Sequence, residues 1–130
     1  MAFPTTNGRR RGFTLMELLV SLAIIALLLT IAVPRYFSQL QTSKETVLRE
    51  NLRQMRDAID KFYGDNNRYP QNLDELVTKK YLRRIPPDPL TGDARTWVAV
   101  PPADKNKSGV YDIKSGAPGN GKDGTAYSSW

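Results

Sequence analysis

The sequence contains no cysteine and no histidine. Without cysteine the chain can form neither disulfides nor thiolate metal sites, although this leaves its cellular compartment open. Without histidine it lacks the usual general base and the usual zinc ligand, so catalysis would need carboxylates or a lysine. No strand–loop motif for phosphate binding or for a nucleophile occurs either. We therefore expect a protein that is not an enzyme.

Charge is missing from one long stretch near the amino terminus. Residues 18–33 carry no ionisable side chain, and Glu17 is the only such residue between Phe13 and Val33. About 20 apolar residues are enough for a helix to cross a bilayer. The rest of the 130-residue chain is polar and too short for a large core. We therefore expect it to depend on a long helix or on neighbouring subunits.

Positive charge gathers in front of the apolar stretch. The net charge is +6, and Arg9, Arg10 and Arg11 supply three of these charges, with no acid among the first twelve residues. The positive-inside rule places this end in the cytoplasm and the carboxy-terminal part across the membrane. Once these three charges are subtracted, the remaining +3 is too mild to indicate nucleic-acid binding.

Glu17 allows three interpretations of the apolar stretch. An ordinary signal peptide needs small residues after its apolar part, and "IAVPR" (residues 31–35) is a poor cleavage site. A simple signal anchor leaves Glu17 unexplained, because a carboxylate costs about 2.5–3.5 kcal/mol at the bilayer centre. Cleavage between Gly12 and Phe13 would instead keep the helix and create a new amino terminus four residues from Glu17.

The sequence around that bond, "GFTLME" (residues 12–17), lies between a short basic leader and an uncharged tract. This pattern resembles the class III signal of type IV pilins and type II secretion pseudopilins. The resemblance implies that a prepilin peptidase cuts after Gly12 and methylates the amino group of Phe13. It also implies that Glu17 attracts the amino terminus of a neighbouring subunit during filament assembly. A carboxylate that is costly in lipid would then be offset by a cationic partner.

Helical periodicity continues beyond the apolar stretch. Pro34 predicts a kink or a locally melted turn, with a helix end at this point as the alternative. Residues 35–63 predict an amphipathic helix with polar residues, Glu45 among them, between the apolar ones. Asp57 and Asp60 are interpreted as part of a solvated charged face rather than as an acid–base pair. The apolar stripe consists of Leu40, Val47, Leu48, Leu52, Met55, Ile59 and Phe62.

The remaining residues predict a small domain. Residues 64–67 carry helix-ending chemistry, and Asn72 is a plausible cap for a short helix over residues 73–82. Three prolines between residues 85 and 92 exclude a regular element there. Residues 96–100 and 109–115 predict two strands of an antiparallel hairpin.

The last segment, residues 116–130, is rich in glycine and polar residues. We expect a loop pinned by Tyr127 and Trp130. The predicted fold is therefore α+β: a long amino-terminal helix packed on a small antiparallel sheet with a carboxy-terminal loop, as in pilins. The predicted organisation is a removed leader (1–12), a transmembrane helix that forms the filament core (13–33), an amphipathic helix (34–63) and a small periplasmic domain (64–130).

The outer half also resembles one branch of that family. "NNRYP", "LDEL", "YLRRIPPDPLTG" and the ending "YDIKSGA…DGTAYSSW" are similar to the G-type major pseudopilin of type II secretion. The resemblance implies a structural subunit stored in inner-membrane lipid and assembled by an inner-membrane platform, with minor pseudopilins, into a homopolymeric periplasmic filament that drives protein export. A type IV pilin for adhesion, motility or DNA uptake is the alternative, and a membrane-anchored enzyme or binding module is a third.

G-type pseudopilins commonly bind calcium in the carboxy-terminal loop, which makes calcium the one cofactor that the resemblance implies. Calcium takes six to eight oxygen ligands. After residue 100 the chain offers only Asp104, Asp112 and Asp123 as carboxylates, without a closely spaced run of acids. Asp112 and Asp123 are the best candidates, and hydrogen bonds together with the Trp130 ring are the alternative means of holding the loop.

Overall fold

The computed structural model describes residues 2–3 and 12–130. It divides into two compact units, Met1–Ser38 and Gln39–Trp130, which we call the first and second units. Helix α1, Leu15–Asn66, contributes to both. Most of the predicted leader, including its three arginines, lies outside the described residues.

In the first unit α1 carries only exposed side chains. Thr14 starts the helix: its carbonyl accepts the N–H of Leu18 (3.1 Å) and its hydroxyl oxygen accepts the N–H of Glu17 (3.1 Å). The hydroxyls of Ser21 and Thr30 donate to backbone carbonyls of the preceding turn, so they are satisfied without water. Neither hydroxyl therefore adds an unsatisfied donor to the apolar surface of the helix.

Helix α1 passes through Pro34 without interruption. The predicted continuation is confirmed and the alternative of a helix end at Pro34 is wrong, because the residues on both sides favour helix. A kink at Pro34 stays a prediction. The helix ends at Asn66 rather than at Tyr63, and Asn67 adopts a left-handed conformation (φ 55°) that stops it.

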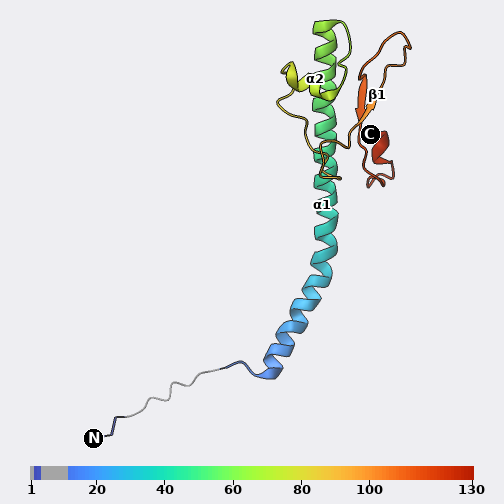
Figure 1. The fold of residues 1–130 in the computed structure, drawn as a ribbon. Helices are drawn as coiled ribbons and strands as arrows, with labels where there is room; N and C mark the ends of the chain where they lie inside the picture. The colour runs from blue at the N-terminus through green and yellow to red at the C-terminus, as the bar shows by residue number, and fades with distance from the viewer. Residues whose placement is uncertain (1, 4–11) are drawn as a thin grey trace. The chain divides into compact units, whose positions relative to one another are not determined.

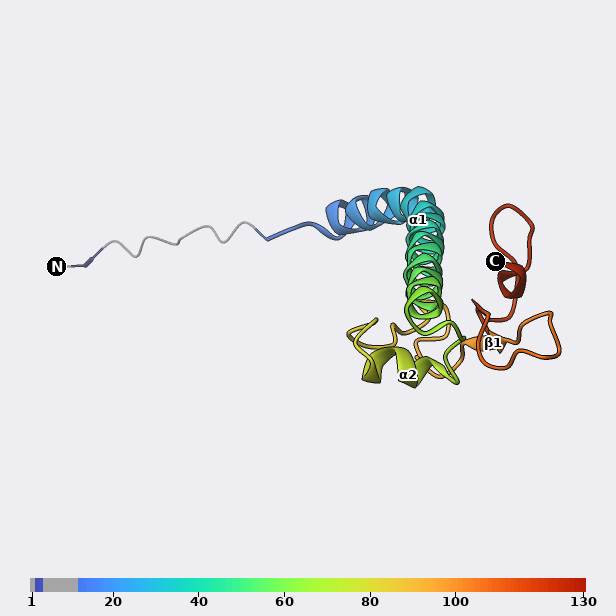
Figure 2. The same ribbon diagram turned by 90° about the horizontal axis from the view of Figure 1, so that it is seen from above.

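The second unit closes its core against the carboxy-terminal half of α1. Figure 1 shows α2 (Leu73–Thr78) and the sheet of β1 (Val98–Val100) and β2 (Asp112–Lys114) beside this half of the helix, and Figure 2 shows the same from above. From the predicted stripe, the structure buries the five residues Leu48, Leu52, Met55, Ile59 and Phe62. The burial predicted for Leu40 and Val47 is wrong, because both point away from this core and are exposed.

Two adjoining clusters make up this core. The first joins the middle of α1 to the sheet and the carboxy-terminal segment through Leu52, Ile113 and Tyr127. The second joins the end of α1 to α2 through Phe62 and Leu76. The α+β architecture with a long amino-terminal helix and a small antiparallel sheet is confirmed.

The cap predicted for α2 is confirmed, since the side-chain oxygen of Asn72 accepts the N–H of Glu75 (2.9 Å). The helix ends at Thr78, so the prediction that it reaches residue 82 is wrong. Lys80 takes a left-handed conformation (φ 67°), and the N–H of Tyr81 bonds back to the carbonyl of Leu76 (2.8 Å). This Schellman-type ending stops the helix without a glycine.

The predicted hairpin is confirmed with shorter strands. Strands β1 and β2 pair antiparallel, with Ala99 opposite Ile113, whose side chain is buried. The predicted carboxy-terminal loop contains a 3-10 turn, η1 (Tyr127–Ser129), and its Tyr127 is buried as predicted. The loop is therefore part of the packed domain.

Candidate functional site

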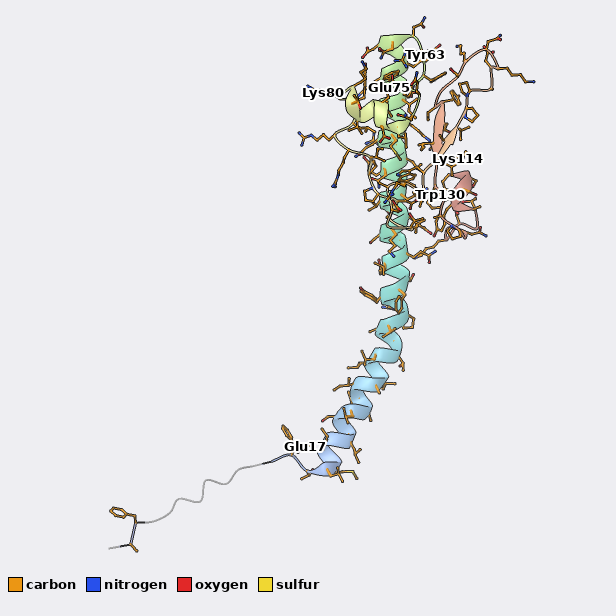
Figure 3. All side chains as sticks on the ribbon, viewed as in Figure 1. Glu17, Tyr63, Glu75, Lys80, Lys114 and Trp130 are labelled. Carbon is orange, nitrogen blue, oxygen red and sulfur yellow. The ribbon has the colours of Figure 1, made fainter. Side chains whose placement is uncertain are left out.

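Glu17 lies in the first turn of α1, where Figure 3 labels it. Backbone N–H groups at the start of a helix have no intrahelical partner, and the helix dipole adds positive potential there. A carboxylate in this turn is therefore favoured by the helix that carries it. Glu17 stands three residues after the capping residue Thr14, which is the spacing of a capping box.

Thr14 is a functional candidate that our reading of the sequence missed. Its hydroxyl fixes the first turn of α1 and hence the position of Glu17 relative to the residues before the helix. The signal was present in the sequence as a Thr-x-x-Glu pattern in front of an apolar run.

The bond between Gly12 and Phe13 is open to a peptidase. Phe13 is 85% exposed. A side chain at Gly12 would meet nothing within 4 Å. Both residues precede the helix, so the peptide bond between them is not held in a regular element.

The apolar side chains of the first unit are not buried by the residues that the structure describes. Every residue of the most apolar 18-residue window of α1 is exposed, and α1 is long and apolar enough to cross a membrane. Burying one leucine or isoleucine side chain stabilises by about 1.5–3 kcal/mol, so leaving this whole surface in water is strongly unfavourable. An apolar surface of this size is typical of a segment that interacts with lipid or with other proteins.

Asp112, a predicted calcium candidate, is paired with an arginine. Its Oδ1 accepts Arg56 Nε (2.8 Å) and the N–H of Ile113 (2.7 Å). Arg56 also donates to the carbonyls of Ile113 (3.0 Å) and Trp130 (2.5 Å), so one guanidinium ties α1, β2 and the end of the chain together. The arginine supplies the positive charge next to this carboxylate.

Asp123, the other candidate, is engaged in the same way. Its Oδ1 accepts the hydroxyl (2.6 Å) and the N–H (3.0 Å) of Thr125, while Oδ2 lies 3.4 Å from an Arg49 nitrogen. The Thr125 hydroxyl and N–H hold the pKa of the Asp123 carboxyl below its usual value, and Arg49 adds a smaller effect. Within residues 2–3 and 12–130, no three acidic side chains gather at one point. Both carboxylates already accept hydrogen bonds from groups of the chain itself.

Glu45 is the second residue that sequence reasoning missed. We placed it on the solvated face of α1, but its side chain is buried, with a residue exposure of 9%. Its Oε1 accepts the Tyr127 hydroxyl (2.9 Å), the N–H of Lys122 (2.9 Å) and Gln41 Nε2 (3.2 Å). No local pattern reveals this, because two of the three partners lie more than 70 residues away in the sequence.

Known proteins are similar to this chain both in its amino-terminal motif and over nearly its full length. Residues 7–33 match the family described as the prokaryotic N-terminal methylation motif. The type II secretion system core protein G of Pectobacterium carotovorum is 30% identical over 139 residues, which cover 94% of this chain and 87% of that protein. The protein of the same description from Pseudomonas aeruginosa is 28% identical, with coverage of 91% and 92%.

A pilin shares less of the chain. The type IV major pilin protein PilA of Myxococcus xanthus is 36% identical over 70 residues, which cover 54% of this chain and 32% of the pilin. No solved structure matches. The similarity to core protein G extends over nearly the full length of both chains, through the motif and the outer domain alike. This chain therefore belongs to the family of type II secretion system core protein G.

Proposed function

We propose that this chain is a structural subunit of a type II secretion pseudopilus. The observation that supports the proposal is the apolar surface of the first unit, which follows Glu17 and is exposed throughout the part of the chain that the structure describes. Lipid covers this surface while the subunit is stored in the inner membrane. Copies of the same helix cover it once subunits polymerise, so one surface serves as membrane anchor and as filament core.

The topology follows from the charges that flank this helix. The arginine-rich start stays in the cytoplasm, and the second unit lies in the periplasm. A prepilin peptidase then cuts after Gly12 and methylates the amino group of Phe13. The exposure of Phe13 and the open surroundings of Gly12 support access to this bond.

Glu17 supplies the register between subunits. Leaving a carboxylate in lipid is unfavourable, and the positive amino terminus of a neighbouring subunit offsets that penalty when the two meet in a dry filament. Thr14 keeps the first turn of α1 intact, so that Glu17 meets its partner from a defined position. The subunit itself catalyses no reaction; its function is to position and pack.

The remaining partners are those that a pseudopilus requires. An inner-membrane assembly platform adds copies of the subunit, minor pseudopilins join the same filament, and the growing periplasmic filament pushes proteins toward the outer membrane. The relatives named as core protein G support this place in a secretion system.

Intact mass and amino-terminal sequencing of protein recovered from membranes test the proposal. We expect a chain that begins with N-methylated Phe13, and a chain that keeps its leader in cells without the peptidase. A chain that begins at Met1 in cells that contain the peptidase would overturn the proposal, because Glu17 would then have no amino terminus to meet.

A type IV pilin for adhesion, motility or DNA uptake is the second candidate, and the similarity to PilA of Myxococcus xanthus favours it. Deletion experiments separate the two functions. Loss of protein export on deletion of the gene, with motility and DNA uptake intact, supports the secretion filament. The reverse pattern supports the pilin.

A further inference from the structure

The carboxy-terminal loop, residues 116–130, is held against α1 along its length. In Figure 3 the labelled Trp130 lies next to the carboxy-terminal half of α1. The loop has little regular structure apart from η1 and a single bridge between Asn120 and Ala126. Side chains of α1 supply several of the contacts that keep it in place.

One of these contacts is centred on Glu45. Its Oε1 gathers the N–H of Lys122 and the hydroxyl of Tyr127, both from the loop. The Lys122 ammonium in turn donates to the hydroxyl of Thr42, one turn earlier on α1. A buried carboxylate with several donors contributes more than a surface pair, because water does not screen it.

Two arginines of α1 make the remaining contacts. Arg49 stacks over the Trp130 ring at 4.2 Å from its centroid and also reaches Asp123. Arg56 pairs with Asp112 and donates to the carbonyl of Trp130. The positive charge next to Asp123 of the loop and next to Asp112 of β2 thus comes from the protein itself.

The ring of Trp130 fills the space inside the loop. A Cβ built on Gly121 would lie 2.3 Å from a ring carbon of Trp130, so the ring packs directly on the backbone. Its indole N–H donates to the Thr125 hydroxyl (2.6 Å). The interior of the loop is therefore occupied by an aromatic side chain.

We propose that this loop is held by cations and hydrogen-bond donors of the chain itself, and that it folds and functions without calcium. Two arginines, Arg49 beside Asp123 and Arg56 beside Asp112, supply the positive charge that a metal ion would otherwise supply to these carboxylates. A divalent cation placed among them would be repelled, and it would have to displace donors that already bond both acids. Glu45 is the residue around which this metal-free arrangement is built.

Thermal unfolding of the full chain in detergent tests the proposal. We expect the same Tm in millimolar calcium, in millimolar magnesium and in excess chelator, because a ligand that binds only the folded state would raise the Tm. We expect Tyr127→Phe, which removes one donor to Glu45, to lower the Tm by about 3–8 °C under all three conditions. A control variant, Glu50→Gln, changes an exposed carboxylate on the same helix and should leave the Tm nearly unchanged.

The Trp130 indole N–H signal in an NMR spectrum provides a second measurement. It uses the wild-type chain, so it does not depend on whether a variant folds. We expect its position in the wild-type chain to be the same with calcium and with chelator. A Tm that rises by several degrees with calcium alone, or an indole signal that appears only when calcium is present, would overturn the proposal. Neither result bears on the proposed filament function, which depends on Phe13 and Glu17.

Discussion

The two halves of helix α1 differ in what covers their apolar side chains. In the first unit every side chain of the helix is exposed, although leucine, isoleucine, valine and alanine dominate the sequence. In the second unit the same helix buries residues such as Leu52 and Phe62 completely or nearly so against a sheet, a short helix and a loop. The structure thus buries the apolar residues of the second half and leaves those of the first half exposed.

This difference shows how one helix can serve two purposes. The first half has apolar residues on all sides, which suits a lipid environment or a bundle of identical helices. The second half has a single apolar stripe among charged residues, which suits one partner on one side. Substitutions should therefore affect assembly in the first half and folding in the second.

The largest effect is expected from Glu17→Ala. It removes the carboxylate that the proposal assigns to the contact between subunits, so we expect sheared filaments to fall at least about 10-fold. The Tm of the second unit should stay the same, since Glu17 lies outside it. Glu50→Ala, an exposed carboxylate on the second half of α1, is the matched control. Full assembly of the Glu17 variant would reopen the interpretation of an anchored domain.

The second prediction concerns the core of the second unit. Phe62→Ala should destabilise it by about 3–5 kcal/mol, because Phe62 is fully buried among Ile59, Leu76 and Val110. Val47→Ala on the same helix should cost no more than about 0.5 kcal/mol, since Val47 is 48% exposed. Urea unfolding followed by circular dichroism measures both. Equal losses would mean that the exposed side of this half is covered as well.

The third prediction tests the packing of Trp130 on the loop. Gly121→Ala should cost about 1–3 kcal/mol, because the new methyl group collides with the indole ring. The Trp130 indole N–H signal should shift, while that of Trp97, which donates to the Pro86 carbonyl, serves as an internal reference. Gly64→Ala is the control: it lies in α1 with nothing within 4 Å, and helix propensity favours the change. An unshifted Trp130 signal would contradict the packing.

The smallest effect is expected on the Tm at low pH, through the ion pair between Glu75 and Arg68. The ion pair with Arg68, followed by the N–H of Gln71, holds the pKa of the Glu75 carboxyl below its ordinary value of 4.5. Because the pKa is lower in the folded state, the ionised Glu75 carboxyl stabilises the fold. This stabilisation is fully present above pH 4.5 and is lost as the pH falls through the pKa of the folded state. Glu75→Gln should flatten the fall of Tm in acid, and Arg68→Met should reproduce most of that change. An unchanged acid profile in Glu75→Gln would show that the pair contributes nothing measurable.

Much of the fold could be predicted because its signals are local. The Asn72 cap and the two short strands each depend on neighbours within a few residues, and both predictions are confirmed, the strands with narrower bounds. The helix end predicted near Gly64 falls at Asn66. The end of α2 could not be predicted in the same way. Its stop depends on Lys80 in a left-handed conformation, which propensity disfavours for lysine and which the surrounding packing imposes.

The candidate site residues likewise divide into those that local sequence reveals and those that depend on distant contacts. Glu17, Gly12 and Phe13 could be identified because an ionisable residue in an apolar run and a basic leader are visible in the sequence alone. The burial of Glu45 could not, since charged residues at helical spacing usually lie in solvent and its partners come from the far end of the chain.

The sequence by itself determined the long apolar helix, the processing signal and the family, because hydrophobicity, charge bias and motif spacing are properties of short segments. The folded structure was needed to show that Glu45 is buried and that Asp112 and Asp123 pair with arginines of α1. Those outcomes depend on residues such as Arg49 and Asp123, 74 positions apart, meeting across the fold. No local pattern encodes such contacts, because they exist only once the core has closed.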